Sequence, residues 1–333
     1  MIDLITTLAE AYGPVGQESG VRQTIEQLIK PYVDEIRTDP LGNLIAYKSG
    51  SSSEHRIMLS AHMDEIGLMV THIDENGFLR FQPLGGVGPW TSLGQRVRFA
   101  DGTVGAVSSE KLKDIKELEF DKMFIDIGAT SAGEAQQKVR IGSVACFDRT
   151  VAVQGKRLSG KALDDRVGCA VLVEALRRLE APVSDVYAVF SVHEEVGARG
   201  AGPAAYSIDP TVGIAIDVTP TGDTPEGEKL PVKLGEGVAI KVKDSSLLTH
   251  PKVKEHLAEL AEKAGIKHQY EVLGYGGTDA GTIHTIRAGI PSGAISIPVR
   301  YVHTPVEMVD LDDVEAAVEL TCALLESPVP DLA

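Results

Sequence analysis

The chain has 333 residues, 43% of them apolar, so it is long enough to fold into more than one globular unit. Its 32 basic and 48 acidic residues give a formal net charge of −16, which argues against nucleic acid as a partner because phosphates would be repelled. Three widely spaced cysteines exclude a disulfide framework, and the absence of a long apolar run or basic export signal predicts a cytoplasmic protein without a membrane partner.

The first part of the chain predicts two helices followed by two strands. Apolar residues recur at spacings of three and four in residues 2–8 and 21–29, which is typical of amphipathic helices. The short apolar runs 43–47 and 56–62 predict strands that are buried on both faces. This order of elements indicates the start of an α/β domain.

The pattern changes after residue 66. Asn76-Gly77 and Asp101-Gly102 lie between alternating apolar and polar runs, which is typical of β-hairpins. Glycines and a proline interrupt the segment between these turns. We therefore predict a small β-rich domain over residues 67–154, inserted into the first domain.

Helix and strand patterns alternate again in the rest of the chain. The predicted elements are a helix at 165–179, strands at 186–192, 212–217 and near Ile295, and helices at 250–265 and 312–325. The prediction is thus one α/β domain, built from residues 1–66 and 155–333, with the β-rich insertion between its two parts.

Five short segments place metal-type ligands beside strand-like runs. They are AHMDE (61–65), ALDDR (162–166), HEEVG (193–197), AIDVT (215–219) and YVHTP (301–305). In open α/β sheets the functional site lies beyond the carboxyl ends of the strands, so these segments are expected to converge there. Together they supply His, Asp, a Glu pair, Asp and His, which is enough for two divalent cations and a base.

We predict a two-metal centre from these residues. Asp164 is expected to bridge the two ions, with His62 and Asp217 on one ion and Glu195 and His303 on the other. Three carboxylates neutralise three of the four positive charges, and the remaining charge favours a bridging hydroxide near neutral pH. His, Asp and Glu ligands suit zinc, cobalt and manganese, of which zinc is the expected metal.

Other residues in these segments are expected to assist. Glu194 can take a proton from the attacking water and transfer it to the leaving amine. Asp64 can accept the second imidazole N–H of the neighbouring His62 and so orient its ring. Asp165 is expected to cap the following helix, with Arg166 as a salt-bridge partner. The glycine-rich loop 273–281 is expected to form a wall of the substrate pocket, with Thr278 and Asp279 as candidate residues.

The five motifs, in this order and with the insertion between the first and the second, resemble those of the tetrahedral (TET-type) metalloaminopeptidases, metallopeptidase family forty-two, which includes glutamyl and deblocking aminopeptidases. The resemblance implies a phosphorylase/hydrolase-like mixed sheet flanked by helices, a barrel-like insertion, and a two-zinc or two-cobalt aminopeptidase acting on peptides. It also implies a cis bond between Asp164 and Asp165. Self-association into a homododecamer of dimers, assisted by the insertion, is a further implication.

Other functions remain open at this point. Co-catalytic zinc carboxypeptidases and amide deacylases use a similar ligand set, but their extra domain normally lies between the Glu pair and the last His. Here the long gap separates His62 from Asp164. Carbohydrate hydrolysis is an alternative from another class, because relatives have been labelled endoglucanases, although glycosidases seldom need a metal. A non-catalytic scaffold that binds metals only for assembly is the last alternative.

Overall fold

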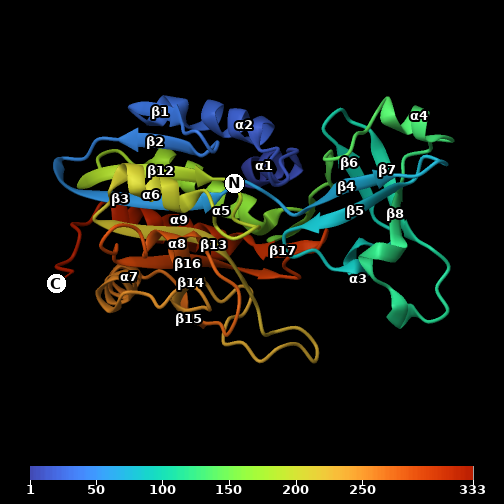
Figure 1. Cartoon of the computed structure of the whole chain (residues 1–333). Coiled ribbons are helices and arrows are strands. Elements are labelled where there is room, and N and C mark those ends of the chain that lie inside the picture. The colour runs from blue at the N-terminus through green and yellow to red at the C-terminus, as the bar shows by residue number, and fades with distance from the viewer. Residues whose placement is uncertain (333) are drawn as a thin grey trace.

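A large mixed sheet forms the main lobe of the computed structural model, which describes residues 1–332 (Figure 1). Its strands lie in the order β1-β2-β12-β3-β13-β16-β17-β11-β10, and β14 and β15 extend it from β16. The strands are β1 (Glu35–Thr38), β2 (Leu44–Lys48), β3 (Ser52–His62), β10 (Ala152–Gln154), β11 (Arg157–Gly160), β12 (Ser184–Ser191), β13 (Val212–Pro220), β14 (Val238–Lys243), β15 (His268–Val272), β16 (Ser292–Arg300) and β17 (Glu307–Asp310).

Helices cover both faces of this sheet. Alternate residues of a strand point to opposite faces, so that Ile57 and Leu59 of β3 enter one apolar core while Met58 enters another. The larger core lies under α1 (Ile2–Glu10), α2 (Ser19–Ile29), α5 (Leu163–Arg178), α7 (Pro251–Ala264) and α9 (Leu311–Leu325), with the short η1 (Lys30–Tyr32) after α2. The smaller core lies under α6 (Ala201–Ile208) and α8 (Asp279–Ile283).

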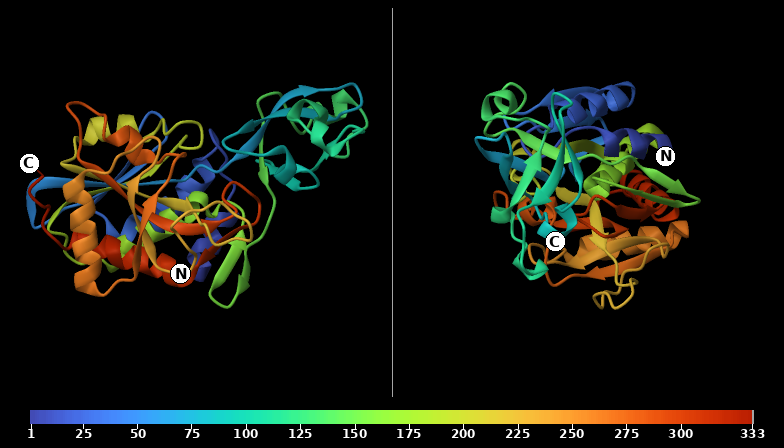
Figure 2. Two further views of the ribbon diagram at one scale, coloured as in Figure 1. Left: turned by 90° about the horizontal axis from the view of Figure 1, so that it is seen from below. Right: turned by 90° about the vertical axis from the view of Figure 1, so that its right-hand side faces the viewer.

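The second lobe is a closed β-barrel that projects from one end of the large sheet (Figure 2). Its strands are β4 (Gly67–Ile73), β5 (Leu79–Leu84), β6 (Arg96–Phe99), β7 (Val104–Ser109), β8 (Met123–Asp126) and β9 (Val144–Phe147). The short helices α3 (Pro89–Ser92), η2 (Ile115–Glu117), η3 (Phe120–Lys122) and α4 (Ala132–Gln136) join them. The barrel has an apolar core of its own, because alternate residues such as Leu68 and Val70 point inward.

The architecture confirms the predicted fold class, a mixed α/β sheet flanked by helices and interrupted by a barrel-like β insertion. β10 pairs with β11 in the large sheet although it lies within the range 67–154. The peptide bond between Asp164 and Asp165 is cis, as the resemblance implied. Among residues 1–332, no helix is both long and apolar enough to span a bilayer.

Candidate metal centre

Four adjacent parallel strands bring the predicted ligands to one edge of the sheet. β12, β3, β13 and β16 run parallel to one another in this order. His62 is the last residue of β3 and lies opposite Ser191, the last residue of β12. The Glu pair begins three residues after the end of β12, Asp217 lies near the end of β13, and His303 lies three residues after the end of β16. Because the carboxyl ends of these parallel strands lie at the same edge of the sheet, residues that are distant in sequence meet there.

The Asp164 carboxylate lies between two imidazoles. Its Oδ1 is 3.0 Å from Nε2 of His62, and its Oδ2 is 3.3 Å from Nε2 of His303. Asp217 lies on the His62 side, with its Oδ1 3.9 Å from His62 Nε2. Glu195 lies on the other side, with its Oε2 3.3 Å from His303 Nε2. The arrangement forms two ligand groups that share Asp164, and within each group the ligand atoms lie within 4.8 Å of one another.

Asp64 supports the Glu pair more directly than it supports His62. Its two carboxylate oxygens accept the main-chain N–H groups of Glu194 and Glu195 at 3.0 and 3.1 Å. The Nδ1 atom of His62 is 3.1 Å from the main-chain oxygen of Asp64, but 3.6 Å from its carboxylate. The sequence had suggested the carboxylate as the partner of this ring. In the structure, the carbonyl of the same residue is the nearer acceptor, because the carboxylate is turned toward the Glu pair.

Glu307 is a buried residue outside the five sequence motifs. Its Oε2 accepts the main-chain N–H of Asp164 at 3.0 Å, and its Oε1 accepts the main-chain N–H of His303 at 2.8 Å. One carboxylate thus holds two of the predicted ligands in place. Glu307 is the first residue of β17, and its position four residues after His303 is the only sequence signal that could have pointed to it.

The electrostatics of the site reflect an excess of buried carboxylates. Burial raises the pKa of Glu194 and of Asp217 well above the ordinary range, and neighbouring acids raise them further. Burial lowers the pKa of the two histidines, but acidic partners outweigh it: the pKa of His303 rises to about 11, and that of His62 rises well above its usual value. Burial alone would raise the pKa of Asp164, but hydrogen bonds from both imidazoles hold this pKa below its usual range.

The residues present fit a pair of divalent cations. Carboxylate oxygens and imidazole nitrogens are donors for zinc, cobalt and manganese, and positive ions would neutralise the negative charge gathered here. The Oε1 atom of Glu195 is buried and has no hydrogen-bond partner within residues 1–332, which leaves a donor atom available to an ion. The arrangement can therefore hold metal and place a further carboxylate, that of Glu194, beside it.

The barrel lobe reaches the centre through two glycines that follow β5. A Cβ atom on Gly86 would lie only 2.1 Å from Nδ1 of His303. A Cβ atom on Gly85 would lie 2.7 Å from Oε2 of Glu195. In the sequence these glycines indicate only a break between hairpins. They also allow the barrel backbone to pack against two predicted ligands.

The remaining predicted residues lie around the centre. The predicted ligands line a cavity with a volume of about 690 Å³, and Thr278 lines this cavity too. Asp279 is buried behind it and accepts a hydrogen bond from Ser60 at 2.6 Å. Asp165 accepts the main-chain N–H of Gly168 at 3.1 Å, as expected for a residue at a helix start. The expected salt bridge of Asp165 with Arg166 is wrong.

Arg166 instead turns toward the N-terminal segment. Its Nη2 lies 3.3 Å from Oε1 of Glu65, and the same atom donates to the main-chain oxygen of Gly13 at 3.2 Å. The Nζ of Lys161 completes this buried cluster, at 2.7 Å from Oε2 of Glu65. Arg166 pairs with Glu65 because the acid is buried beside it, whereas the Asp165 carboxylate accepts main-chain N–H groups, among them that of His62 at 3.2 Å.

Known proteins are similar to this chain in sequence and in fold over almost its whole length. A family model described as M42 glutamyl aminopeptidase matches residues 42–320. The chain is 36% identical to the lysyl aminopeptidase of Pyrococcus furiosus, over 98% of this chain and 97% of that protein. The structure of an aminopeptidase from the archaeon Desulfurococcus kamchatkensis is similar with a TM-score of 0.95 and 43% identity, covering 99% of this chain and 96% of that one.

A third similar structure is that of the TET1 peptidase of Pyrococcus horikoshii, which can assemble into a tetrahedron or a large octahedral shell. Its TM-score is 0.86 and its identity 33%, and the match covers 97% of this chain and 98% of that one. The barrel insertion lies within these matched lengths, so the likeness extends to both lobes.

Proposed function

Because this chain belongs to the M42 glutamyl aminopeptidase family, we propose that it removes N-terminal residues from peptides at a centre of two divalent cations. The family is the one that the sequence motifs suggested. The observation that carries the two-metal proposal is the position of Asp164, whose two carboxylate oxygens each face a different histidine. A carboxylate shared in this way suits a bridge between two ions.

The proposed ligands follow the two groups described above. His62 and Asp217 would hold one cation, Glu195 and His303 the other, and Asp164 both. Zinc is the metal we expect, and cobalt or manganese suit the same donors. When bound, such ions lower the pKa of a water molecule and polarise the carbonyl of the scissile bond.

Glu194 is the proposed general base and acid. It lines the cavity beside both ligand groups, and its main-chain N–H is fixed by the carboxylate of Asp64. Burial raises the pKa of Glu194, which brings a carboxylate closer to the range where it can both accept and donate a proton near neutral pH. Glu194 would take a proton from the attacking water and deliver it to the nitrogen of the leaving peptide. Asp64 acts through Glu194 and through the ring of His62.

We also propose that the chain self-associates as a homododecamer built from dimers, in the cytoplasm. The assembly reported for the TET1 peptidase supports self-association. More than half of each of the Trp90, Ile115 and Ile141 side chains on the barrel lobe is exposed, and such apolar side chains are suited to a contact with another subunit. The three cysteines are free, which fits a reducing compartment. Light scattering after size-exclusion chromatography would measure the mass of the assembly.

The test of the mechanism is the pair of variants Glu194→Gln and Glu180→Gln. Glu180 is exposed and lies outside the cavity, so its variant serves as the matched control. Loss of the proton-transfer group should lower kcat by about 10²–10⁴-fold, while the metal content measured by elemental analysis stays at that of the wild type. Unchanged kcat in metal-loaded Glu194→Gln would disprove the role of this residue.

The same assays separate the alternative functions. Cleavage of N-acylated amino acids without cleavage of free-amine peptides would favour a carboxypeptidase or deacylase. Carbohydrate hydrolysis that survives a chelator would favour a glycosidase, whose chemistry uses two carboxyl groups. Absence of hydrolysis in the metal-loaded wild type would favour a scaffold. Peptide cleavage that chelation abolishes is the result that the proposal predicts.

A further inference from the structure

Beside the metal ligands, the wall of the cavity is formed by apolar residues together with Ser246, Thr278 and Thr282, and this part of the cavity is called the recess. Val218 contributes from β13, Leu273 and Tyr275 from the loop after β15, and Val302 from the segment after β16. Gly276 and Gly277 line the recess without a side chain. The substrate residue that occupies this recess would be surrounded mainly by hydrocarbon.

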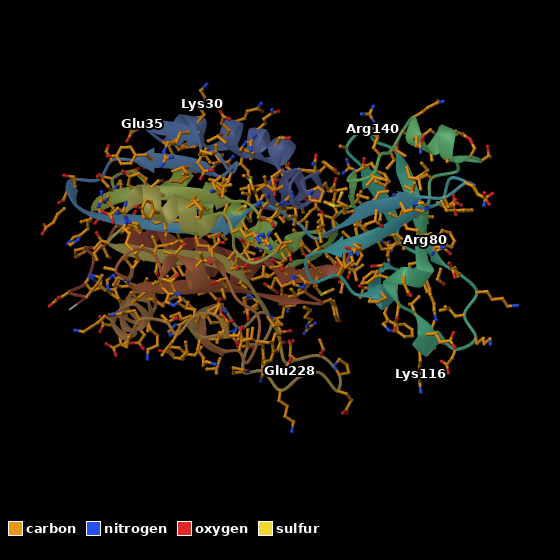
Figure 3. The ribbon with its side chains drawn as sticks, viewed as in Figure 1. Lys30, Glu35, Arg80, Lys116, Arg140 and Glu228 are labelled. Atoms are coloured by element: carbon orange, nitrogen blue, oxygen red, sulfur yellow. The ribbon has the colours of Figure 1, made fainter. Side chains whose placement is uncertain are left out.

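Tyr275 is held at the edge of the recess by an adjacent loop. Its hydroxyl donates a hydrogen bond of 2.6 Å to Oε2 of Glu228. The loop that carries Glu228 extends away from the body of the main lobe (Figure 3). The tyrosine hydroxyl is thus already engaged outside the recess.

Within residues 1–332, Lys241 is the only lysine or arginine that lines this cavity. Its side chain is only 2% exposed, and its Nζ hydrogen-bonds to Glu271 and lies 3.2 Å from Oδ2 of Asp244. Two buried carboxylates therefore more than compensate the one positive charge. Neither carboxylate belongs to a residue that lines the cavity, so both are shielded from a substrate.

We propose, on the basis of the aminopeptidase function above, that the recess selects peptides whose N-terminal residue is uncharged and apolar. A glutamate side chain would find no lysine or arginine free to pair with it, because Lys241 is already paired with Glu271 and Asp244. A lysine side chain would meet the ammonium group of Lys241, with the two acids on its far side. Either charge would lose its hydration without gaining a partner, whereas leucine or methionine would gain contact with the apolar walls.

The test uses pairs of aminoacyl p-nitroanilides that have similar shape and differ in charge, assayed with the zinc- or cobalt-loaded wild-type protein. Glutamine is compared with glutamate, norleucine with lysine, and leucine serves as the reference. We expect kcat/KM to be at least about tenfold higher for the neutral member of each pair, and highest for leucine or norleucine. An equal or higher value for glutamate or lysine would overturn the proposed selectivity but leave the aminopeptidase function intact. Failure to cleave any of the five substrates would overturn both.

A variant tests the role of Lys241 separately. Glu271→Gln leaves the lysine with a single carboxylate partner, so the ratio of kcat/KM for glutamate to that for glutamine should rise about tenfold. Glu259→Gln, on the exposed side of α7, is the matched control and should leave the ratio unchanged. An unchanged ratio in folded Glu271→Gln would show that Lys241 does not govern discrimination against acidic residues. If this variant does not fold, the comparison of wild-type substrates still decides the proposal.

Discussion

The carboxylate of Glu307 accepts the main-chain N–H of Asp164 at 3.0 Å and thereby fixes the residue that both ligand groups share. Its second oxygen accepts the N–H of His303. In the Glu307→Gln variant, an NH₂ group replaces one of the two carboxylate oxygens. The main-chain N–H of either Asp164 or His303 then faces a donor in place of its acceptor. We expect activity and metal affinity to fall by about 10–100-fold, as is typical when a group supporting a ligand is lost. Steady-state kinetics and a metal titration would measure both.

The exposed Glu319 on α9 provides the control for this variant. Glu319→Gln should retain wild-type kinetics and metal affinity. Equal behaviour of Glu307→Gln and Glu319→Gln would show that the hydrogen bonds of Glu307 do not position the centre.

Gly86→Ala is expected to displace His303. The new methyl group would lie 2.1 Å from the ring nitrogen Nδ1, so the ring or the barrel backbone must move. A displacement of about 1 Å at a reacting centre can lower the rate by about 10²-fold, and we expect a loss of this order. Activity per bound metal ion is the quantity to measure.

Gly133→Ala is the matched substitution within the barrel lobe, because within residues 1–332 its new methyl group would have no atom within 4 Å other than those of its chain neighbours and its own helix backbone. It should leave activity unchanged. If Gly86→Ala were as active as Gly133→Ala, the close packing of the barrel against His303 would have no functional consequence.

Metal binding should release protons near pH 7. Hydrogen bonds to acidic partners raise the pKa of His303 to about 11 despite burial, so its metal-free imidazole carries two protons at neutral pH. A metal ion requires the neutral ring, and the displaced proton enters solution. Affinity should therefore weaken as the pH falls and strengthen as it rises. Isothermal titration calorimetry in two buffers with different ionisation enthalpies should give a release on the order of one proton or more per protein, and net proton uptake would contradict this assignment.

Arg166 is expected to be essential for stability. It is fully buried, and its guanidinium donates to the main-chain oxygens of Met63 and Gly13 and pairs with Glu65. Arg166→Met would leave these acceptors without their donor and should lower the free energy of unfolding by about 3–5 kcal/mol. Chemical denaturation of the metal-free protein would measure this change. The control is Arg140→Met at an exposed position, which should change the free energy of unfolding by less than about 0.5 kcal/mol.

The sequence predicts those parts of the site that depend on strand ends. His62, Asp217 and His303 follow or lie in apolar runs, and parallel strands bring their carboxyl ends to one edge, so convergence could be expected without coordinates. Glu307 could not be assigned in this way, because its role depends on the pairing of β17 with β16, which turns its carboxylate back toward the centre.

Long-range packing explains the other differences. The approach of Gly86 to His303 depends on how the barrel is docked against the main lobe, and no local pattern encodes that contact. The pairing of Arg166 with Glu65 and of Lys241 with Glu271 likewise joins buried charges from separate segments. For such residues the sequence shows the charge but gives no information on its partner.

Anomalous diffraction from zinc-soaked crystals would show whether Asp164 lies between two cations. We expect two anomalous peaks, one among His62, Asp217 and Asp164, and the other among Glu195, His303 and Asp164. A single peak, or peaks remote from the Asp164 carboxylate, would contradict this expectation.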